Sequence, residues 1–167
     1  TKDTLTSTLQ RNGFEVLECE VIWHNYIIST TVRKRQKLDL THFYNHQTKI
    51  KDEIQNYIQR YKSKKVAIYG AGHQSLAIIS LTNIEDKIKY IIDDAPFKQN
   101  KYTPATHVPI VSVEKLEKDP VDAVIIMAAS YSDEIFKKII SKFGKNMDLA
   151  ILRDYGLEHM CEKYWIF

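Results

Sequence analysis

The chain is poor in the residues that build disulfide frameworks, membrane spans and polyanion-binding surfaces. Only two cysteines, Cys19 and Cys161, occur among 167 residues, and they form no C-x-x-C pair. Neither a disulfide framework nor a thiolate zinc site is therefore indicated. No apolar run reaches the roughly 20 residues that cross a bilayer, and Thr1 is followed by a polar stretch rather than a signal-peptide core. We expect a cytoplasmic protein without a membrane partner.

The chain also lacks a strong excess of charge. Lys and Arg number 24 and Asp and Glu number 21, which leaves a formal net charge of +3. The one dense basic run, "RKRQK" at 33–37, is interpreted as a solvated strand end rather than a nucleic-acid patch. No nucleic-acid partner is expected, and the composition is that of an ordinary globular protein.

The first third of the chain predicts a helix, a strand pair and a second helix. Leu5 and Leu9 share one helical face in residues 3–12. Apolar and polar residues then alternate in two stretches, which predicts an antiparallel hairpin too small to bury a core alone. Apolar residues at steps of three, four and seven predict a long amphipathic helix over 39–62. His42 and His46 on it are four apart, but no third ligand is nearby, and no metal site is predicted.

From there on, apolar strand-like runs alternate with helical segments. This alternation predicts an α/β fold with a Rossmann-like, doubly wound, parallel five-stranded sheet, preceded by a helix-hairpin remnant and a long linking helix. The predicted strands are 65–70, 88–94, 108–111, 122–128 and 148–154, and the helices are 73–83, 112–118 and 132–143. The predicted divisions are 1–36 for helix and hairpin, 37–63 for the linking helix and 64–167 for the C-terminal domain.

A glycine turn, "YGAGHQS" at 69–75, follows the first predicted strand and opens a helix, where a phosphate-binding turn belongs. Gly70 permits the tight turn, Gly72 lets a ligand approach the backbone, and Asp93 ends the next strand, where a ribose hydroxyl could be read. Ser75 replaces the third glycine of the fingerprint, so a turn without a ligand stays an alternative. At the carboxyl edge of the sheet, 70–74, Asp93 and the turn 128–132 are expected to line one crevice.

The loop 94–107 carries prolines that restrict its conformation and side chains that suit an anionic, partly aromatic ligand. It is expected to lie over the same edge of the sheet, although it could also merely cap that edge. The groups in question are Lys98, Lys101, Tyr102, Thr103 and His107.

The stretch "DDAPFKQNKYTPATHVPIVSVEKLEKDPVDAVIIMAASYSDEI" resembles the C-terminal domain of S-adenosylmethionine-dependent sugar C-methyltransferases. The hallmark of that family is similar to Asp-x-x-Pro-x-Lys-Gln-x-x-Tyr-x-Pro-x-Thr-His-x-Pro-Ile. The matching residues are Asp93, Pro96, Lys98, Gln99, Tyr102, Pro104, Thr106, His107, Pro109 and Ile110. Upstream, residues 4–35 resemble the final helix and last two strands of the family's methyltransferase domain.

This resemblance implies a C-terminal portion of a C-methyltransferase that acts on a nucleotide-linked deoxysugar. The expected partners are the nucleotide-linked sugar and a missing N-terminal methyltransferase domain, with a homodimer as a further option. S-adenosylmethionine and an upstream zinc module would belong to the parent, so this portion is expected to hold no cofactor and no catalytic residue. The last residues, 164–167, are apolar and are expected to dock on their own domain.

The predicted site binds substrate and spans the glycine turn, the loop and the turn at 128–132. The backbone of 70–74 and Lys98 would meet phosphate, Asp93 or Tyr102 would meet the nucleoside, and His107 would brace the loop. The alternatives are a stand-alone nucleotide or dinucleotide sensor and a purely structural domain. The predicted substrate-binding residues are Gly70, Gly72, His73, Gln74, Asp93, Lys98, Tyr102, Thr103, His107 and Ser130.

Overall fold

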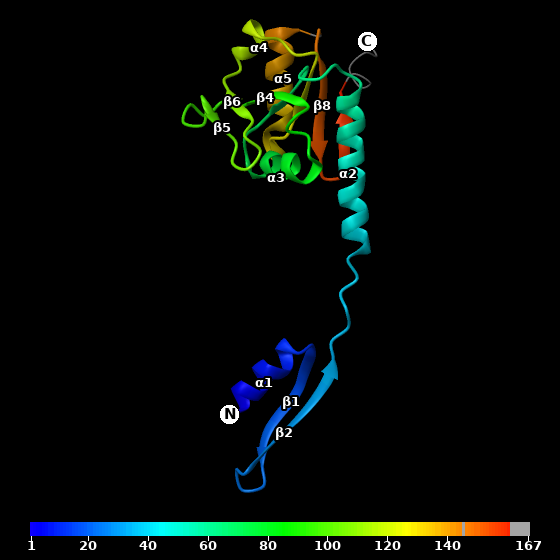
Figure 1. The fold of residues 1–167 in the computed structure, drawn as a ribbon, viewed down its shortest axis with the longest axis vertical. Coiled ribbons are helices and arrows are strands. Elements are labelled where there is room, and N and C mark those ends of the chain that lie inside the picture. Colours follow the sequence, from blue (N-terminus) through cyan, green and yellow to red (C-terminus); the bar gives the residue numbers. More distant parts are fainter. Residues whose placement is uncertain (145, 161–167) are drawn as a thin grey trace. The chain divides into compact units, whose positions relative to one another are not determined.

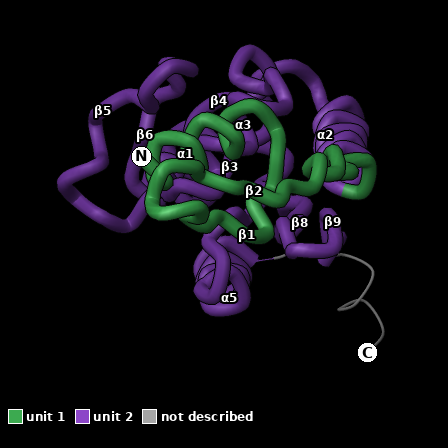
Figure 2. The backbone as a smooth tube through the Cα atoms, turned by 90° about the horizontal axis from the view of Figure 1, so that it is seen from below, with its two compact units in different colours: residues 1–42 green, residues 43–167 purple. Residues whose placement is uncertain are grey.

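Two units make up the chain, residues 1–42 and residues from Phe43 onward, and Figure 2 colours them separately. The computed structural model describes residues 1–144 and 146–160, drawn as a ribbon in Figure 1. The predicted docking of residues 164–167 lies outside the described residues. All buried side chains of the described residues lie in the second unit, and the candidate site is therefore sought there.

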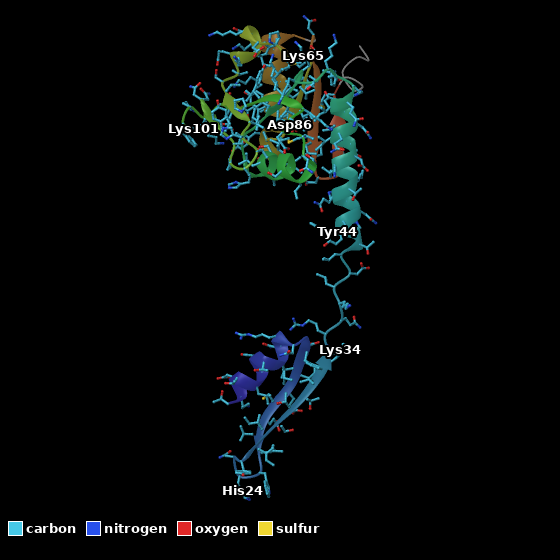
Figure 3. All side chains as sticks on the ribbon, viewed as in Figure 1. His24, Lys34, Tyr44, Lys65, Asp86 and Lys101 are labelled. Atoms are coloured by element: carbon cyan, nitrogen blue, oxygen red, sulfur yellow. The ribbon has the colours of Figure 1, made fainter. Side chains whose placement is uncertain are left out.

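The first unit is a helix followed by a two-stranded antiparallel hairpin. It comprises α1 (Lys2–Arg11), β1 (Phe14–Ile22) and β2 (Ile27–Lys34). The Thr1 side chain caps α1 by accepting the Thr4 N–H at 3.2 Å. His24, labelled in Figure 3, lies in the turn between the strands with a φ of 56°. No residue from 1 to 42 is buried, and Leu17, Trp23 and Tyr26 are among the exposed apolar side chains.

The second unit begins within the first turn of the long helix α2 (Thr41–Gln59), whose apolar stripe is part of the core. Ile50, Ile54, Tyr57 and Ile58 are buried, whereas Phe43 is exposed. The spacing of these residues is that of one helical face. The predicted linking helix therefore packs into the core of the C-terminal unit through its second half, from Ile50 onward.

A seven-stranded sheet is the centre of this unit. Its order is β5-β6-β4-β3-β7-β8-β9; neighbours are parallel from β6 to β8, and the two edge strands are antiparallel. The strands are β3 (Val66–Tyr69), β4 (Ile88–Ile92), β5 (Lys101–Tyr102), β6 (Pro109–Val111), β7 (Ala123–Ile126), β8 (Asp148–Arg153) and β9 (Gly156–His159). The α/β class is confirmed. The predicted number of five strands is too low, because it omits the short edge strands β5 and β9.

Helices cover both faces of the sheet and give it two apolar cores. The helical elements are α3 (His73–Thr82), α4 (Lys115–Lys118), the 3-10 turn η1 (Ala129–Tyr131) and α5 (Ser132–Phe143). One core joins α2 and α3 to Val66 and Ile68, and the other joins α4 and α5 to Ala67 and Tyr69. Side chains of β3 thus alternate between the two cores. Among the described residues, no helix has the length and apolar character that a membrane crossing requires.

Gly70, directly after β3, is fixed by the backbone of the neighbouring strand. Its φ is 111°, and a Cβ built on it would lie 2.6 Å from the Met127 carbonyl oxygen. Gly72 differs, because its φ is −101° and nothing lies within 4 Å of a Cβ there. The fold therefore requires glycine at 70 but not at 72.

Replacing Gly70 by Ala should lower the free energy of unfolding by roughly 2–4 kcal/mol, because strain and a backbone clash add. Gly72→Ala is the matched control and should change it by less than about 0.5 kcal/mol. Urea titration followed by circular dichroism measures both. A Gly70→Ala variant as stable as Gly72→Ala would contradict this account of the turn.

The hairpin should exchange its amide protons much faster than the parallel strands do. Residues 1–42 bury no side chain, so little apolar burial opposes local opening. Amides of β1 and β2 should show at least about 100-fold less protection than those of β3 and β7 in native-state hydrogen exchange. Equal protection in the two units would show that something other than the described contacts stabilises the hairpin.

Candidate functional site

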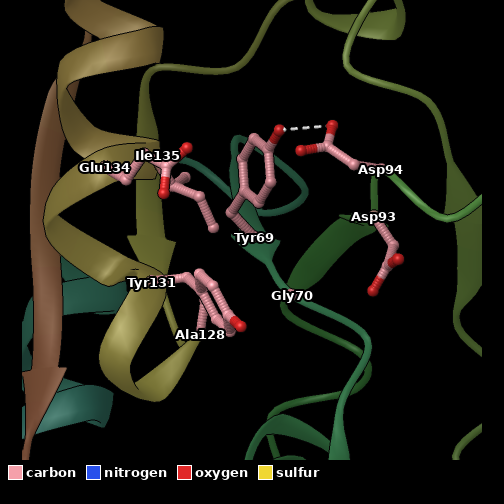
Figure 4. Close-up of a pocket in the computed structure, with 8 residues that line it drawn as sticks. All are labelled: Tyr69, Gly70, Asp93, Asp94, Ala128, Tyr131, Glu134 and Ile135. Carbon is pink, nitrogen blue, oxygen red and sulfur yellow. Dashed lines mark hydrogen bonds between the residues drawn. The ribbon is translucent and has the colours of Figure 1, made fainter.

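A cavity of about 220 Å³ opens at the carboxyl ends of β3, β4 and β7. β3 leads through α3, on one face of the sheet, to β4, whereas β7 leads through α5, on the other face, to β8. The strand order therefore reverses between β3 and β7. Ligands of open α/β sheets bind at such points. The lining residues, drawn in Figure 4, are Tyr69, Gly70, Asp93, Asp94, Ala128, Tyr131, Glu134 and Ile135.

Asp93, at the end of β4, connects three segments through its carboxylate. Oδ2 accepts the Ala71 N–H at 2.7 Å and the Lys98 ammonium at 3.0 Å, and Oδ1 accepts the Ala95 N–H at 2.9 Å. The residue is 8% exposed. Burial raises the pKa of such a carboxyl, but the hydrogen bonds from Ala95, Lys98 and Ala71 outweigh it, so the pKa of Asp93 lies below its usual value. Asp93 is therefore an ionised brace between the glycine turn and the loop.

Asp94 points to the opposite side of the chain, toward Tyr69 (Figure 4). The Tyr69 hydroxyl donates to Asp94 Oδ1 at 2.8 Å, and the Lys138 ammonium contacts both carboxylate oxygens at 2.8 Å. Burial, and then the hydrogen bond to Asp94, raise the pKa of the Tyr69 phenol. Tyr69 is thus a neutral donor in the wall of the crevice.

The turn after β7 and the start of α5 form the remaining wall. Tyr131 is 67% exposed and presents a ring to the crevice, and Glu134 adds a carboxylate. The Ser132 hydroxyl accepts the Ala128 N–H at 3.3 Å and holds the turn against the helix. Ser130 lies in the same turn and is exposed, between two lining residues.

Within the predicted turn 128–132, Ala128 and Tyr131 line the crevice. Sequence reasoning missed five other residues that line or buttress it. Two of them flank predicted site residues, since Tyr69 precedes Gly70 and Asp94 follows Asp93. The other three lie on α5, and the strand end that leads into this helix was the available signal. The missed residues are Tyr69, Asp94, Glu134, Ile135 and Lys138.

Gly72, His73 and Gln74 follow Gly70 in the glycine turn, but none of them is among the residues that line the crevice. Gly72 is the N-cap of α3 and forms no side-chain cap. His73 is exposed, and Gln74 lines a different cavity, of about 270 Å³, together with His46 and Asp154. Across residues 1–144 and 146–160, no three His, Cys, Asp or Glu side chains are arranged to hold a metal ion.

The second half of the loop folds into a tight connection at the edge of the sheet. The Thr103 hydroxyl accepts the Val108 N–H at 2.8 Å and bonds the Thr106 hydroxyl at 2.7 Å. Tyr102, on β5, is 58% exposed and stacks on His107 with ring centroids 4.5 Å apart. These residues contact one another and are absent from the lining of the crevice.

The predicted site residues therefore fall into separate groups. The structure brings Gly70 and Asp93 to the crevice and ties Lys98 to Asp93. Within the loop, Gln99 also bonds to Asp93: its side-chain amide donates to the Asp93 backbone carbonyl at 2.9 Å. The residues at 102–107 cap the sheet edge at β5 and β6, which lie three and two places from β3 in the strand order.

Comparison with known proteins gives one family match. The family model described as "C-methyltransferase C-terminal domain" matches residues 31–148, which include the glycine turn, the loop and the crevice. A search of curated proteins gives no match. Among solved structures, the chain is similar to UDP-D-quinovosamine 4-dehydrogenase from Vibrio fischeri, at 17% identity and a TM-score of 0.44, over 59% of this chain and 93% of that one.

Asp93→Asn should destabilise the protein at neutral pH and less so in acid. A carboxyl whose folded pKa is lowered stabilises the fold fully above its unfolded pKa, about 3.9, and loses this effect as the pH falls through the folded pKa. The cost at pH 7 should be roughly 1–3 kcal/mol, measured by urea unfolding, and should shrink near pH 3.5. The control Asp94→Asn removes a half-exposed carboxylate and should cost less. If the loss of stability in Asp93→Asn relative to wild type grew as the pH fell, the lowered pKa of Asp93 would be contradicted.

Proposed function

Because the chain belongs to the family of C-methyltransferase C-terminal domains, we propose that it is the C-terminal portion of an S-adenosylmethionine-dependent C-methyltransferase. The substrate of that parent would be a nucleotide-linked deoxysugar. This portion binds the nucleotide-sugar in the crevice at the ends of β3, β4 and β7, and it performs no catalysis by itself. S-adenosylmethionine and zinc belong to the parent in this proposal, and the binding role needs neither.

The observation that carries the proposal is the position of the crevice. The five parallel strands have the order β6-β4-β3-β7-β8, which is the order 3-2-1-4-5 of Rossmann-like nucleotide-binding sheets when the parallel strands are counted along the chain. The cavity lies beside β3, where that order reverses. A cavity at this point with a few convergent polar groups is where such sheets bind ligands.

The groups in the crevice suit the hydroxyl-bearing and aromatic parts of a nucleotide-sugar. Asp94 and Glu134 offer carboxylate oxygens that accept hydrogen bonds from ribose or sugar hydroxyls. The exposed ring of Tyr131 offers a face on which a base can stack. In the parent, a base would remove a proton next to the sugar ketone and the resulting enolate would take the methyl group, so the sugar must be held in a fixed position.

The first unit supports the same parent. Its hairpin exposes a set of large apolar side chains and buries none, as expected of a piece whose covering elements belong to another segment. We propose that the rest of a methyltransferase domain covers them. The exposed residues of the hairpin are Leu17, Val21, Ile22, Trp23, Tyr26, Ile27 and Ile28.

A structural domain without a ligand is the second candidate. The observation that favours it is the self-contained loop, in which Thr103 bonds Thr106 and Tyr102 stacks on His107. This candidate explains the loop motif by packing alone. It predicts no binding of any nucleotide diphosphate, which separates it from the first.

Uridine or thymidine diphosphate should bind the chain, and Tyr131→Ala should weaken that binding about tenfold through loss of stacking. Tyr155→Ala is the matched control, because Tyr155 is similarly exposed, at 62% against 67%, but lies in the turn between β8 and β9. Isothermal calorimetry measures both variants. No heat from either diphosphate at millimolar concentration, with the protein folded, would favour the structural domain. Equal losses in both variants would remove Tyr131 from the site.

A further inference from the structure

The glycine turn after β3 already holds an anion, and that anion belongs to the protein. In phosphate-binding turns, unpaired backbone N–H groups meet the ligand. Here the N–H of Ala71, the residue between the two glycines, donates to Asp93 Oδ2 at 2.7 Å. The carboxylate therefore takes an N–H of the turn directly before Gly72, the N-cap of α3, beside the helix N-terminus where a dinucleotide fold holds its pyrophosphate.

The cations near this position are also engaged. Lys98 lies 3.0 Å from Asp93 Oδ2, and Lys138 contacts Asp94 at 2.8 Å. Each lysine balances one carboxylate, and Glu134 adds a further negative charge to the lining. A diphosphate placed at Ala71 would meet an ionised, nearly buried carboxylate at short range, and the two lysines described beside the crevice are already paired with carboxylates.

We propose that Asp93 determines the specificity of the crevice by filling the anion position of the glycine turn. It excludes the pyrophosphate of dinucleotides from that turn and leaves the crevice to the nucleoside part of a nucleotide-sugar, whose base and hydroxyls Tyr131, Asp94 and Glu134 can receive. The diphosphate of the substrate then lies away from Ala71. This inference deepens the proposed function, because it states which part of the ligand the crevice receives.

A purely structural role for Asp93 makes a different prediction. If the carboxylate only ties the loop to the turn, removing it lowers stability and creates no affinity for anions. If it fills an anion position, removing it frees the Ala71 N–H and the Lys98 ammonium side by side. Free N–H and ammonium groups at one place form an anion site. Gain of binding is thus a readout that bracing alone would not produce.

The test is pyrophosphate binding by wild type and variants of the full chain, measured by calorimetry. Asp93→Ala should bind pyrophosphate at least about tenfold tighter than wild type, because charged hydrogen bonds become available. Asp94→Ala also frees a lysine in the crevice but no turn N–H, so its gain should be smaller. Asp119→Ala removes a carboxylate paired with Lys89 on another part of the unit and should leave the affinity at its wild-type value.

Three outcomes would overturn the proposal. These are tight pyrophosphate binding by wild type, equal gains in Asp93→Ala and Asp94→Ala, and no gain in a folded Asp93→Ala. If Asp93→Ala does not fold, Asp93→Asn against Asp94→Asn repeats the comparison with near-isosteric side chains, and no gain in Asp93→Asn overturns it. The probe is pyrophosphate, so the result does not depend on nucleotide-sugar binding, and failure of one proposal is distinguishable from failure of the other.

Discussion

The carboxylate of Asp93 is the point on which the carboxyl edge of the sheet depends. One side chain joins the end of β4 to the glycine turn after β3 and to the first half of the loop. Its own carbonyl accepts the Gln99 side-chain amide, and its N–H donates to the carbonyl of Val111, the last residue of β6, at 3.0 Å. A nearly buried carboxylate is costly unless it is well bonded, and here several partners repay that cost together. The shape of the crevice follows from this arrangement.

The loop motif that links the chain to its family is, in large part, a set of contacts among its own members. Lys98 and Gln99 serve Asp93, Thr106 bonds Thr103, and His107 stacks on Tyr102. Loss of one partner would leave another polar group unpaired in a half-buried place, so these residues depend on one another. Recognition of the motif therefore identified the family correctly, but it did not reveal which residues face the crevice.

Apolar patterning predicted the parallel strands β3, β4, β6, β7 and β8 and the main helices of the second unit, since buried β-branched runs and helical stripes carry a strong signal. Apolar patterning did not predict the two short edge strands, β5 and β9. β5 is only Lys101–Tyr102, and β9 is Gly156–His159, without a β-branched residue. The sequence also did not predict which residues Lys98 and Tyr102 contact. The path of the loop depends on left-handed backbone conformations at Asn100, Ala105 and His107, and sequence alone does not indicate these conformations.

The two walls of the crevice differ in how freely they can vary. Gly70 is pressed against the Met127 carbonyl, so the side of the turn tolerates no side chain at that position. Tyr131 and Glu134 project from a surface turn and the first turn of a helix, where replacement disturbs neither core. Related domains can therefore change their ligands by mutation on the α5 side of the crevice while the glycine side stays constant. The α5 side is for this reason the natural target for engineering a new ligand preference.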